Sequence, residues 1–174
     1  SNFMFVAAMN PCPCGYYPGP KCRCTDYEII KYRGKISGPI MDRIDIQKSV
    51  HPVDFFGINE KEPAMSSEQI RKRVEGARKI QQERYADEEG INCNAQMSTS
   101  LIQKYCVLDM PSLELLRVVS EEFGYSARVI HKLLRLARTS ADLDASENIR
   151  LEDVQAVLSC RDLDQSNSKM MVVK

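Results

Sequence analysis

The sequence predicts an α/β segment at its start, followed by a domain that is mainly α-helical. An apolar run at residues 3–9 is typical of a buried strand, and a stretch containing Pro, Gly and Asn follows at residues 52–63. Beyond that stretch, apolar residues recur at helical spacing in several segments. With 43% hydrophobic residues among 174, the chain can bury a real core.

The first expected element is the strand at residues 3–9, which ends at Asn10. Only Ser1 and Asn2 precede it, without an initiator Met. A lone apolar strand needs neighbours in a sheet to be stable. We therefore expect a fragment that begins in mid-domain, with its sheet partners in an N-terminal half that precedes it.

Four of the seven cysteines form two Cys-x-Cys steps joined by a loop rich in Gly and Pro: Cys12, Cys14, Cys22 and Cys24. Four thiolates can converge on a tetrahedral zinc ion, which would then be structural because no coordination position stays open. Cys-x2-Cys is the more usual step, so unligated thiols and an iron–sulfur or redox site stay open as alternatives. The other three cysteines, Cys93, Cys106 and Cys160, occur singly in sequence that predicts helices. There we expect each free thiol to pack as a small buried apolar side chain.

A helix is expected at residues 25–36, followed by a Gly-Pro-x-x-Asp-Arg-x-Asp segment and a short strand at residues 46–50. These elements complete an α/β part at residues 1–56. A linker at residues 57–65 comes next, because the composition changes there.

The second part is predicted to be a bundle of four to five helices at residues 66–161, with a flexible tail at 162–174. The helices are expected at residues 66–88, 98–107, 111–123, 127–142 and 151–160. Ser66 and Ser126 are suitable N-caps, and Gly124 is placed to end a helix.

Basic residues line the polar sides of two of these helices. In the first they are Arg71, Lys72, Arg73, Arg78, Lys79 and Arg84, and in the fourth Arg128, Lys132, Arg135 and Arg138. The first set could contact DNA or a neighbouring subunit, but a solvated face is the interpretation we favour. The apolar stripe of the fourth helix comprises Ile130, Leu133, Leu134, Ala137 and Ala141.

The net charge does not favour binding to nucleic acid or to an anionic membrane, because 24 Lys and Arg residues balance 24 Asp and Glu residues. Any contact with nucleic acid or an anionic surface must come from a local patch. No run of 18 apolar residues and no signal peptide occurs, so we expect a cytoplasmic protein without a membrane partner.

Three separated motifs carry a resemblance to a known family: the strand with Asn10-Pro11-Cys12-Pro13-Cys14-Gly15, the Gly-Pro-x-x-Asp-Arg-x-Asp segment, and residues 125–139. Together they resemble magnesium-chelatase-like AAA+ ATPases of the bacterial competence-protein type. The resemblance implies the C-terminal part of an AAA+ core followed by an all-α lid domain.

The resemblance also implies roles for three residues. Asn10 matches the sensor 1 position, which helps to hold the water that attacks the γ-phosphate, although an Asn also simply ends a strand. Arg43 matches the arginine finger that acts on the neighbouring subunit's nucleotide, the alternative being a surface ion pair with Asp42 or Asp45. Arg128 matches sensor 2, in the first turn of its helix.

The sequence contains neither a Gly-x4-Gly-Lys-Ser/Thr motif nor an apolar strand ending in paired acidic residues. Alone, the chain should therefore not hydrolyse ATP, and ATP and Mg²⁺ belong to the full-length protein. The resemblance implies a hexameric, ATP-driven DNA branch-migration helicase that serves natural transformation or recombination. A subunit of a metal-inserting magnesium chelatase and a zinc-bearing binding module without nucleotide chemistry stay open as alternatives.

Overall fold

The computed structural model of the chain describes residues 3–50 and 65–161. The predicted tail, and the predicted linker apart from Met65, lie outside these residues. The chain divides into two compact units, Ser1–Ile44 (unit 1) and Asp45–Lys174 (unit 2). Each unit is considered by itself below.

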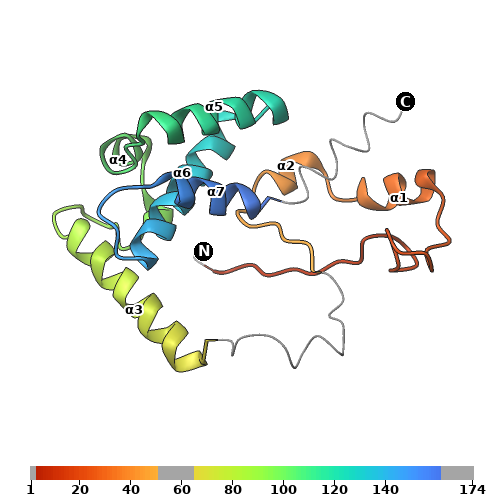
Figure 1. Cartoon of the computed structure of the whole chain (residues 1–174), viewed down its shortest axis with the longest axis horizontal. Coiled ribbons are helices and arrows are strands. Elements are labelled where there is room, and N and C mark those ends of the chain that lie inside the picture. The colour runs from red at the N-terminus through yellow and green to blue at the C-terminus, as the bar shows by residue number, and fades with distance from the viewer. Residues whose placement is uncertain (1–2, 51–64, 162–174) are drawn as a thin grey trace. The chain divides into compact units, whose positions relative to one another are not determined.

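Unit 1 contains the helices α1 (Asp26–Arg33) and α2 (Gly38–Met41) (Figure 1). Thr25 begins α1 with a capping box, because its side chain accepts the Glu28 N–H while the Glu28 carboxylate accepts the Thr25 N–H. The predicted helix at residues 25–36 is confirmed, in a shorter form. The short α2 was not predicted; Ser37 precedes it, and Pro39 is tolerated in its first turn, where no intrahelical N–H bond is needed.

The two predicted strands are not formed in the part of the chain that the structure describes. Residues 3–9 run as an extended segment with exposed side chains, Met4 being 88% exposed (Figure 1). Residues 46–50 make one isolated parallel bridge, between Gln47 and Arg161. The physical reason is that a strand is stable only through a hydrogen-bonded neighbour, and apolar alternation alone does not supply one.

Unit 2 is helical, as the sequence predicts. Its elements are α3 (Ser67–Arg84), the 3₁₀ helix η2 (Asn94–Gln96), α4 (Thr99–Tyr105), α5 (Met110–Phe123), α6 (Ala127–Leu143) and α7 (Leu151–Ser159). All five predicted helices are present, and η2 is the addition. Ser66 and Ser126 accept N–H groups at the starts of α3 and α6, and Gly124 ends α5 in the left-handed conformation.

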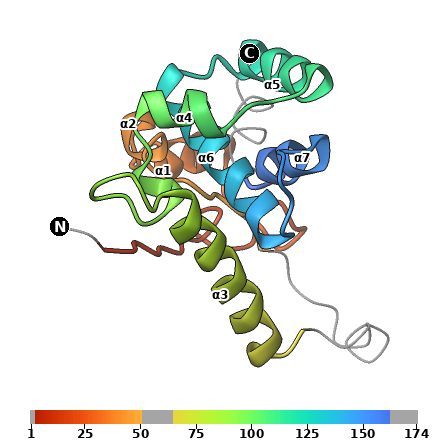
Figure 2. The ribbon, with the colours of Figure 1, turned by 90° about the vertical axis from the view of Figure 1, so that its left-hand side faces the viewer.

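The core of unit 2 is built around α6, which packs against α3, α4, α7 and η2. Leu133, Ala137 and Ala141 are buried, as the predicted stripe requires, and Val129 joins them. Ile130 and Leu134 of that stripe are only partly buried against the cluster. Figure 2 shows α6 behind α3, with α7 beside it.

Two of the arginines predicted for polar faces are instead engaged inside unit 2. Arg138 is 3% exposed, and it shares the buried carboxylate of Asp142 with Arg84 of α3. Asn94 Nδ2 donates to the same carboxylate at 2.8 Å. The solvated face predicted for the first helix was therefore wrong for Arg84, and Arg138 is buried although it was predicted on the more polar side of its helix. The reason is that the buried acid Asp142 offers both arginines a partner.

The N-terminal half of α3 leaves its apolar side chains exposed. Ile70 and Val74 are 48% and 40% exposed, whereas Ala77 and Tyr85 nearer the C-terminal end are buried. Figure 2 shows the start of this helix reaching beyond the other helices of unit 2.

No helix among residues 3–50 and 65–161 combines the length and apolar character needed to cross a membrane.

Candidate functional site

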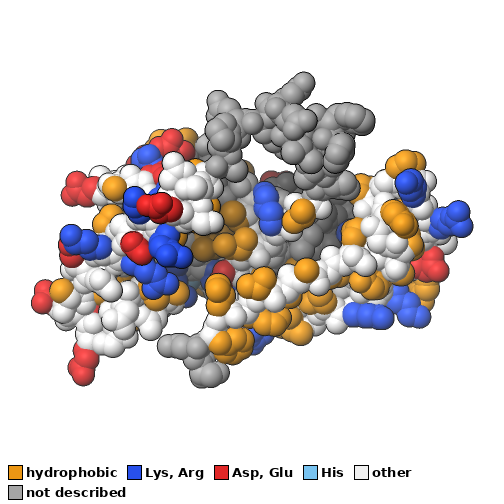
Figure 3. Space-filling view, turned by 90° about the horizontal axis from the view of Figure 1, so that it is seen from below, with side chains coloured by type: hydrophobic (Ala, Val, Ile, Leu, Met, Phe, Trp, Pro, Cys, Tyr) orange, Lys and Arg blue, Asp and Glu red, His pale blue; other side chains and the backbone are white. Residues whose placement is uncertain are grey.

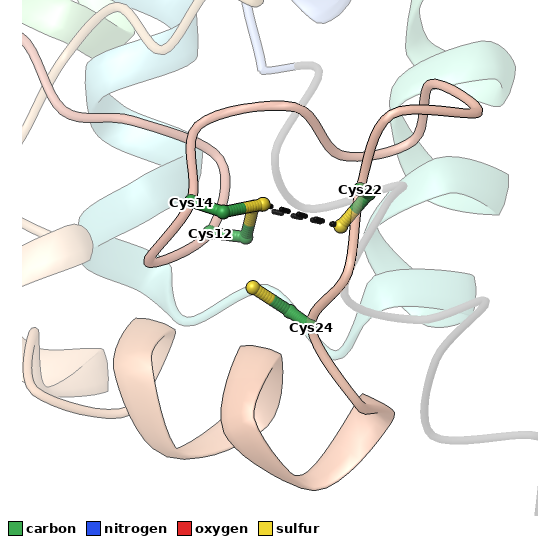
Figure 4. Close-up of side chains that lie close together, drawn as sticks. All are labelled: Cys12, Cys14, Cys22 and Cys24. Carbon is green, nitrogen blue, oxygen red and sulfur yellow. Dashed lines mark hydrogen bonds between the residues drawn. The ribbon is translucent and has the colours of Figure 1, made fainter.

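The four predicted cysteine ligands meet in one cluster in unit 1 (Figure 4). Two turns bring the Cys-x-Cys steps together: Gly15 N–H donates to Cys12 O at 3.0 Å, and Cys22 N–H donates to Gly19 O at 3.0 Å. Gly15 has φ +83°, a conformation that favours glycine. We call residues 12–24 the cysteine loop.

The sulfur atoms have the spacing of a tetrahedral metal site. Cys12 Sγ lies 3.4 Å from Cys14 Sγ and 3.8 Å from Cys22 Sγ, and Cys14 Sγ lies 3.6 Å from Cys22 Sγ. All four sulfurs, including that of Cys24, lie within 4.8 Å of one another. Four sulfurs around zinc stand roughly 3.8 Å apart, given Zn–S bonds of about 2.3 Å. The residues present therefore fit a single tetrahedral metal ion.

The surroundings of the cysteine loop shift the pKa values of Cys14 and Cys24 in opposite directions. Backbone N–H groups of Tyr16 and Arg23 donate to the Cys14 sulfur and lower the pKa of Cys14 to about 6. At Cys24 a hydrogen bond from the Cys14 backbone acts in the same direction, but burial and the neighbouring Cys14 and Cys12 thiols outweigh it. They raise the pKa of Cys24 to about 12. The loop thus favours the thiolate form of Cys14, and thiolate is the form that binds metals.

Arg33 ties the cysteine loop to α1. Its Nε donates to Pro11 O at 3.0 Å, and its guanidinium lies 5.1 Å from the ring centroid of Tyr17. Ile29 of α1 and Cys12 are the buried apolar residues of unit 1 among those described. Helix α1 and the cysteine loop are therefore joined by the Arg33 contacts.

Asn10 follows the extended segment and directly precedes this loop. Asn10 is exposed. Its side-chain amide lies beside Gly15, since a Cβ added at Gly15 would stand 3.7 Å from Asn10 Nδ2. Asn10 therefore lies close to the first turn of the cysteine loop.

Arg43 lies in the turn after α2 and is exposed. Its Nη1 donates to Pro39 O at 2.6 Å. Asp45, one of the two acids expected as its surface partner, pairs with Lys132 at 2.9 Å. This bond holds the Arg43 side chain close to the start of α2.

Arg128 lies in the first turn of α6 and is exposed. Neither an ion pair nor a hydrogen bond of its side chain occurs among the described residues, while other arginines of unit 2, such as Arg73 and Arg150, pair with Asp144. A cation in the first turn of a helix is disfavoured by the helix dipole. The position is therefore unfavourable unless an anion binds there.

Of the predicted site residues, the cysteines are the ones that the described structure gathers into a cluster. Asn10 lies next to the cysteine loop, Arg43 lies after α2 in unit 1, and Arg128 lies in unit 2. Sequence reasoning missed Arg33 and Tyr17, which support the cluster. Their spacing to the cysteines carries no motif, so only the general tendency of Arg to stack on aromatic rings could have suggested them.

Comparison with known families finds two family models that match successive parts of the chain. A family model described as magnesium chelatase, subunit ChlI C-terminal, matches residues 64–161, and one described as magnesium chelatase, subunit ChlI, matches residues 1–56. The chain belongs to the magnesium chelatase ChlI family.

Within that family, the chain is similar to the uncharacterized protein YifB of Escherichia coli K12, with 34% identity over 167 residues. The alignment covers 95% of this chain and 32% of YifB. The competence protein ComM of Haemophilus influenzae is 32% identical over 150 residues, which cover 86% of this chain and 28% of ComM. The chain thus spans about a third of the length of the curated relatives that it matches.

Proposed function

We propose that this chain is the sensor, arginine-finger and lid portion of a ring-forming AAA+ ATPase that drives DNA branch migration. Membership of the magnesium chelatase family and similarity to a competence protein support this proposal. The full-length protein supplies the phosphate-binding and Mg²⁺-binding motifs from its N-terminal half. Hexamer formation, DNA as substrate and a cytoplasmic location are part of the same proposal.

Each of the three polar residues has a distinct task in this function. Asn10, a neutral donor and acceptor, positions the attacking water, and Arg128 contacts the phosphates of the same subunit's nucleotide. Arg43 reaches the nucleotide of the neighbouring subunit, so hydrolysis depends on ring assembly. ATP with Mg²⁺ supplies the phosphoryl group when bound.

The observation that carries the proposal is the position and exposure of Arg128. An exposed arginine in the first turn of α6, with no acidic partner among the described residues, fits a phosphate ligand better than a structural role. The helix N-terminus adds N–H groups that favour the same anion.

The experiment that tests this role uses full-length protein with Arg128→Ala. We expect ATP turnover to fall about tenfold or more, because a phosphate contact is lost from the transition state. Arg71→Ala, at an exposed arginine of α3, is the matched control and should keep wild-type turnover. Equal turnover in all three proteins would remove the sensor 2 assignment.

We further propose that the cysteine cluster binds one structural zinc ion. Four protein sulfurs leave no position for water, so the metal would hold the loop together and perform no chemistry. The proposal is supported by the four sulfur atoms of Cys12, Cys14, Cys22 and Cys24, which all lie within 4.8 Å of one another.

Metal analysis of the untagged chain should find about one zinc per chain. Cys14→Ser should lower this content to well below one, because a ligand is lost, while Cys93→Ser and Cys160→Ser should not change it. Iron in place of zinc, or far less than one metal ion in the wild-type chain, would contradict the zinc site.

A further inference from the structure

Positive charge is concentrated in unit 1, although the whole chain is neutral. Residues 1–44 contain six Lys or Arg residues and three Asp or Glu residues. One of the three acids, Glu28, is used at the start of α1, where its carboxylate accepts the Thr25 N–H and hydroxyl. This unit therefore contains the kind of local patch that a contact with a polyanion requires.

The cations of this patch differ from those of α3 in their surroundings. Lys21, Arg23, Lys31 and Lys35 are exposed, and none of them forms an ion pair with a described residue. In α3, Lys72 and Lys79 pair with glutamates one turn away, and Arg73 and Arg84 pair with Asp144 and Asp142. The charge of α3 is thus largely compensated, while that of the cysteine loop and α1 is not.

Aromatic rings are interleaved with these cations. Tyr27 is 71% exposed and Tyr16 is 57% exposed. Lys31 Nζ lies 5.9 Å from the ring centroid of Tyr27, and Lys35 Nζ lies 5.9 Å from that of Tyr32. Figure 3 shows Lys and Arg side chains beside hydrophobic ones on the right-hand part of the molecule, where α1 lies in Figure 1.

We infer that the cysteine loop and α1 form a surface that binds single-stranded nucleic acid, made of Tyr16, Lys21, Arg23, Tyr27, Lys31 and Lys35. We call these residues the Tyr–Lys surface. The inference deepens the proposed function, and it rests on that function in choosing nucleic acid over other polyanions. Its residues are separate from Asn10, Arg43 and Arg128.

The combination of residues selects single strands over duplex. Lys and Arg neutralise phosphates in either case, but an exposed aromatic ring gains energy by stacking on a base that is not already paired and stacked. The neighbouring cysteine cluster and the Arg33 contacts hold the loop against α1, so the surface is presented by an ordered support.

The test measures fluorescence anisotropy of labelled oligo(dT) with the 174-residue chain, at low salt and without ATP. Wild-type chain should bind, and its affinity should fall as salt is added. Lys21→Glu/Lys31→Glu/Lys35→Glu should weaken binding by about tenfold or more. The matched control is Arg71→Glu/Arg78→Glu, at exposed cations of α3, which should stay within about twofold of wild type.

A second pair of variants tests stacking. Tyr27→Ala should weaken binding to oligo(dT) by about fivefold or more, with no change for an abasic oligonucleotide of the same length. Tyr27→Phe should bind as the wild type does, since it keeps the ring. Lys31→Gln/Lys35→Gln, with unchanged circular dichroism, repeats the charge test without introducing acids.

Four outcomes would overturn the inference: no binding, binding of duplex only, an equal loss in the α3 control, or Tyr27→Ala losing affinity for the abasic strand as well. These outcomes are distinguishable from failure of the proposed function, which is measured as ATP turnover of the Arg128→Ala full-length protein. A chain that binds oligo(dT) while Arg128→Ala keeps full turnover would retain this inference and lose the sensor assignment.

Discussion

Asp142 contacts two arginines and an asparagine in the interior of unit 2. Arg84 Nη1 donates to it at 2.8 Å, Arg138 Nε at 3.1 Å and Asn94 Nδ2 at 2.8 Å. Asp142 itself is 1% exposed. A buried charge is tolerated only when it is paired and hydrogen-bonded, so each member of this cluster depends on the others.

Replacing Asp142 with Asn should therefore destabilise the chain strongly. The change keeps the shape of the side chain but leaves Arg84 and Arg138 without a carboxylate, and we expect the free energy of unfolding to fall by about 3–5 kcal/mol. Urea unfolding measures it. Glu68→Gln, which removes the exposed pair with Lys72, should cost less than about 1 kcal/mol. Similar small losses in both variants would contradict the account of the buried cluster.

The burial of Arg138 shows what sequence periodicity leaves out at the residue scale. Arg138 stands at a position that the 3.6-residue period assigns to the polar side of α6, next to the stripe formed by Leu133, Ala137 and Ala141. Periodicity places residues on faces, whereas burial of a charge is decided by a partner. The four-residue spacing from Arg138 to Asp142 was the available signal, but the same spacing is common on exposed faces.

At the scale of elements, the corner between α5 and α6 depends on the conformation of one residue. Gly124 has φ 62° and ψ 40°, and Ser126 then accepts the Val129 N–H to begin α6. Residues with a Cβ are disfavoured in the left-handed region. An added Cβ at Gly124 would meet no atom within 4 Å, so the cost of a substitution there is conformational and not steric.

Gly124→Ala should lower the free energy of unfolding by about 1–2 kcal/mol, measured by urea unfolding. Gly76 provides a control of opposite sign, because it lies inside α3 and an added Cβ there also meets no atom within 4 Å. Gly76→Ala should raise stability by roughly 0.5–1 kcal/mol. If both variants shifted stability in the same direction, the assigned role of Gly124 would be wrong.

The helices could be predicted from sequence because each carries its own start or stop signals. Ser66, Ser126 and Gly124 act locally, and their effect does not depend on distant residues. The expected strands at residues 3–9 and 46–50 depend on partners elsewhere, so their pattern alone did not determine their state. The cysteine cluster was predictable in composition, because two short Cys-x-Cys steps limit where the sulfurs can lie.

At the scale of the whole molecule, the chain combines a cysteine-bearing unit with a helical bundle of the magnesium chelatase family. Relatives such as YifB and ComM are about three times as long as the part that this chain matches. The residues proposed for nucleotide chemistry are divided between the units, Asn10 and Arg43 in one and Arg128 in the other. In the proposed ring, Arg128 and Arg43 of one subunit serve different nucleotides.

The most direct measurement is ATP turnover by full-length Arg43→Ala and Arg128→Ala proteins, alone and mixed in equal amounts. Each alone should be nearly inactive, because every site lacks one of the two arginines. In a mixed ring, a site regains both when a subunit with intact Arg128 has a neighbour with intact Arg43, so about a quarter of the wild-type rate should return. A mixture as inactive as its components, or wild-type turnover by Arg43→Ala alone, would show that Arg43 does not act on the neighbouring subunit's nucleotide.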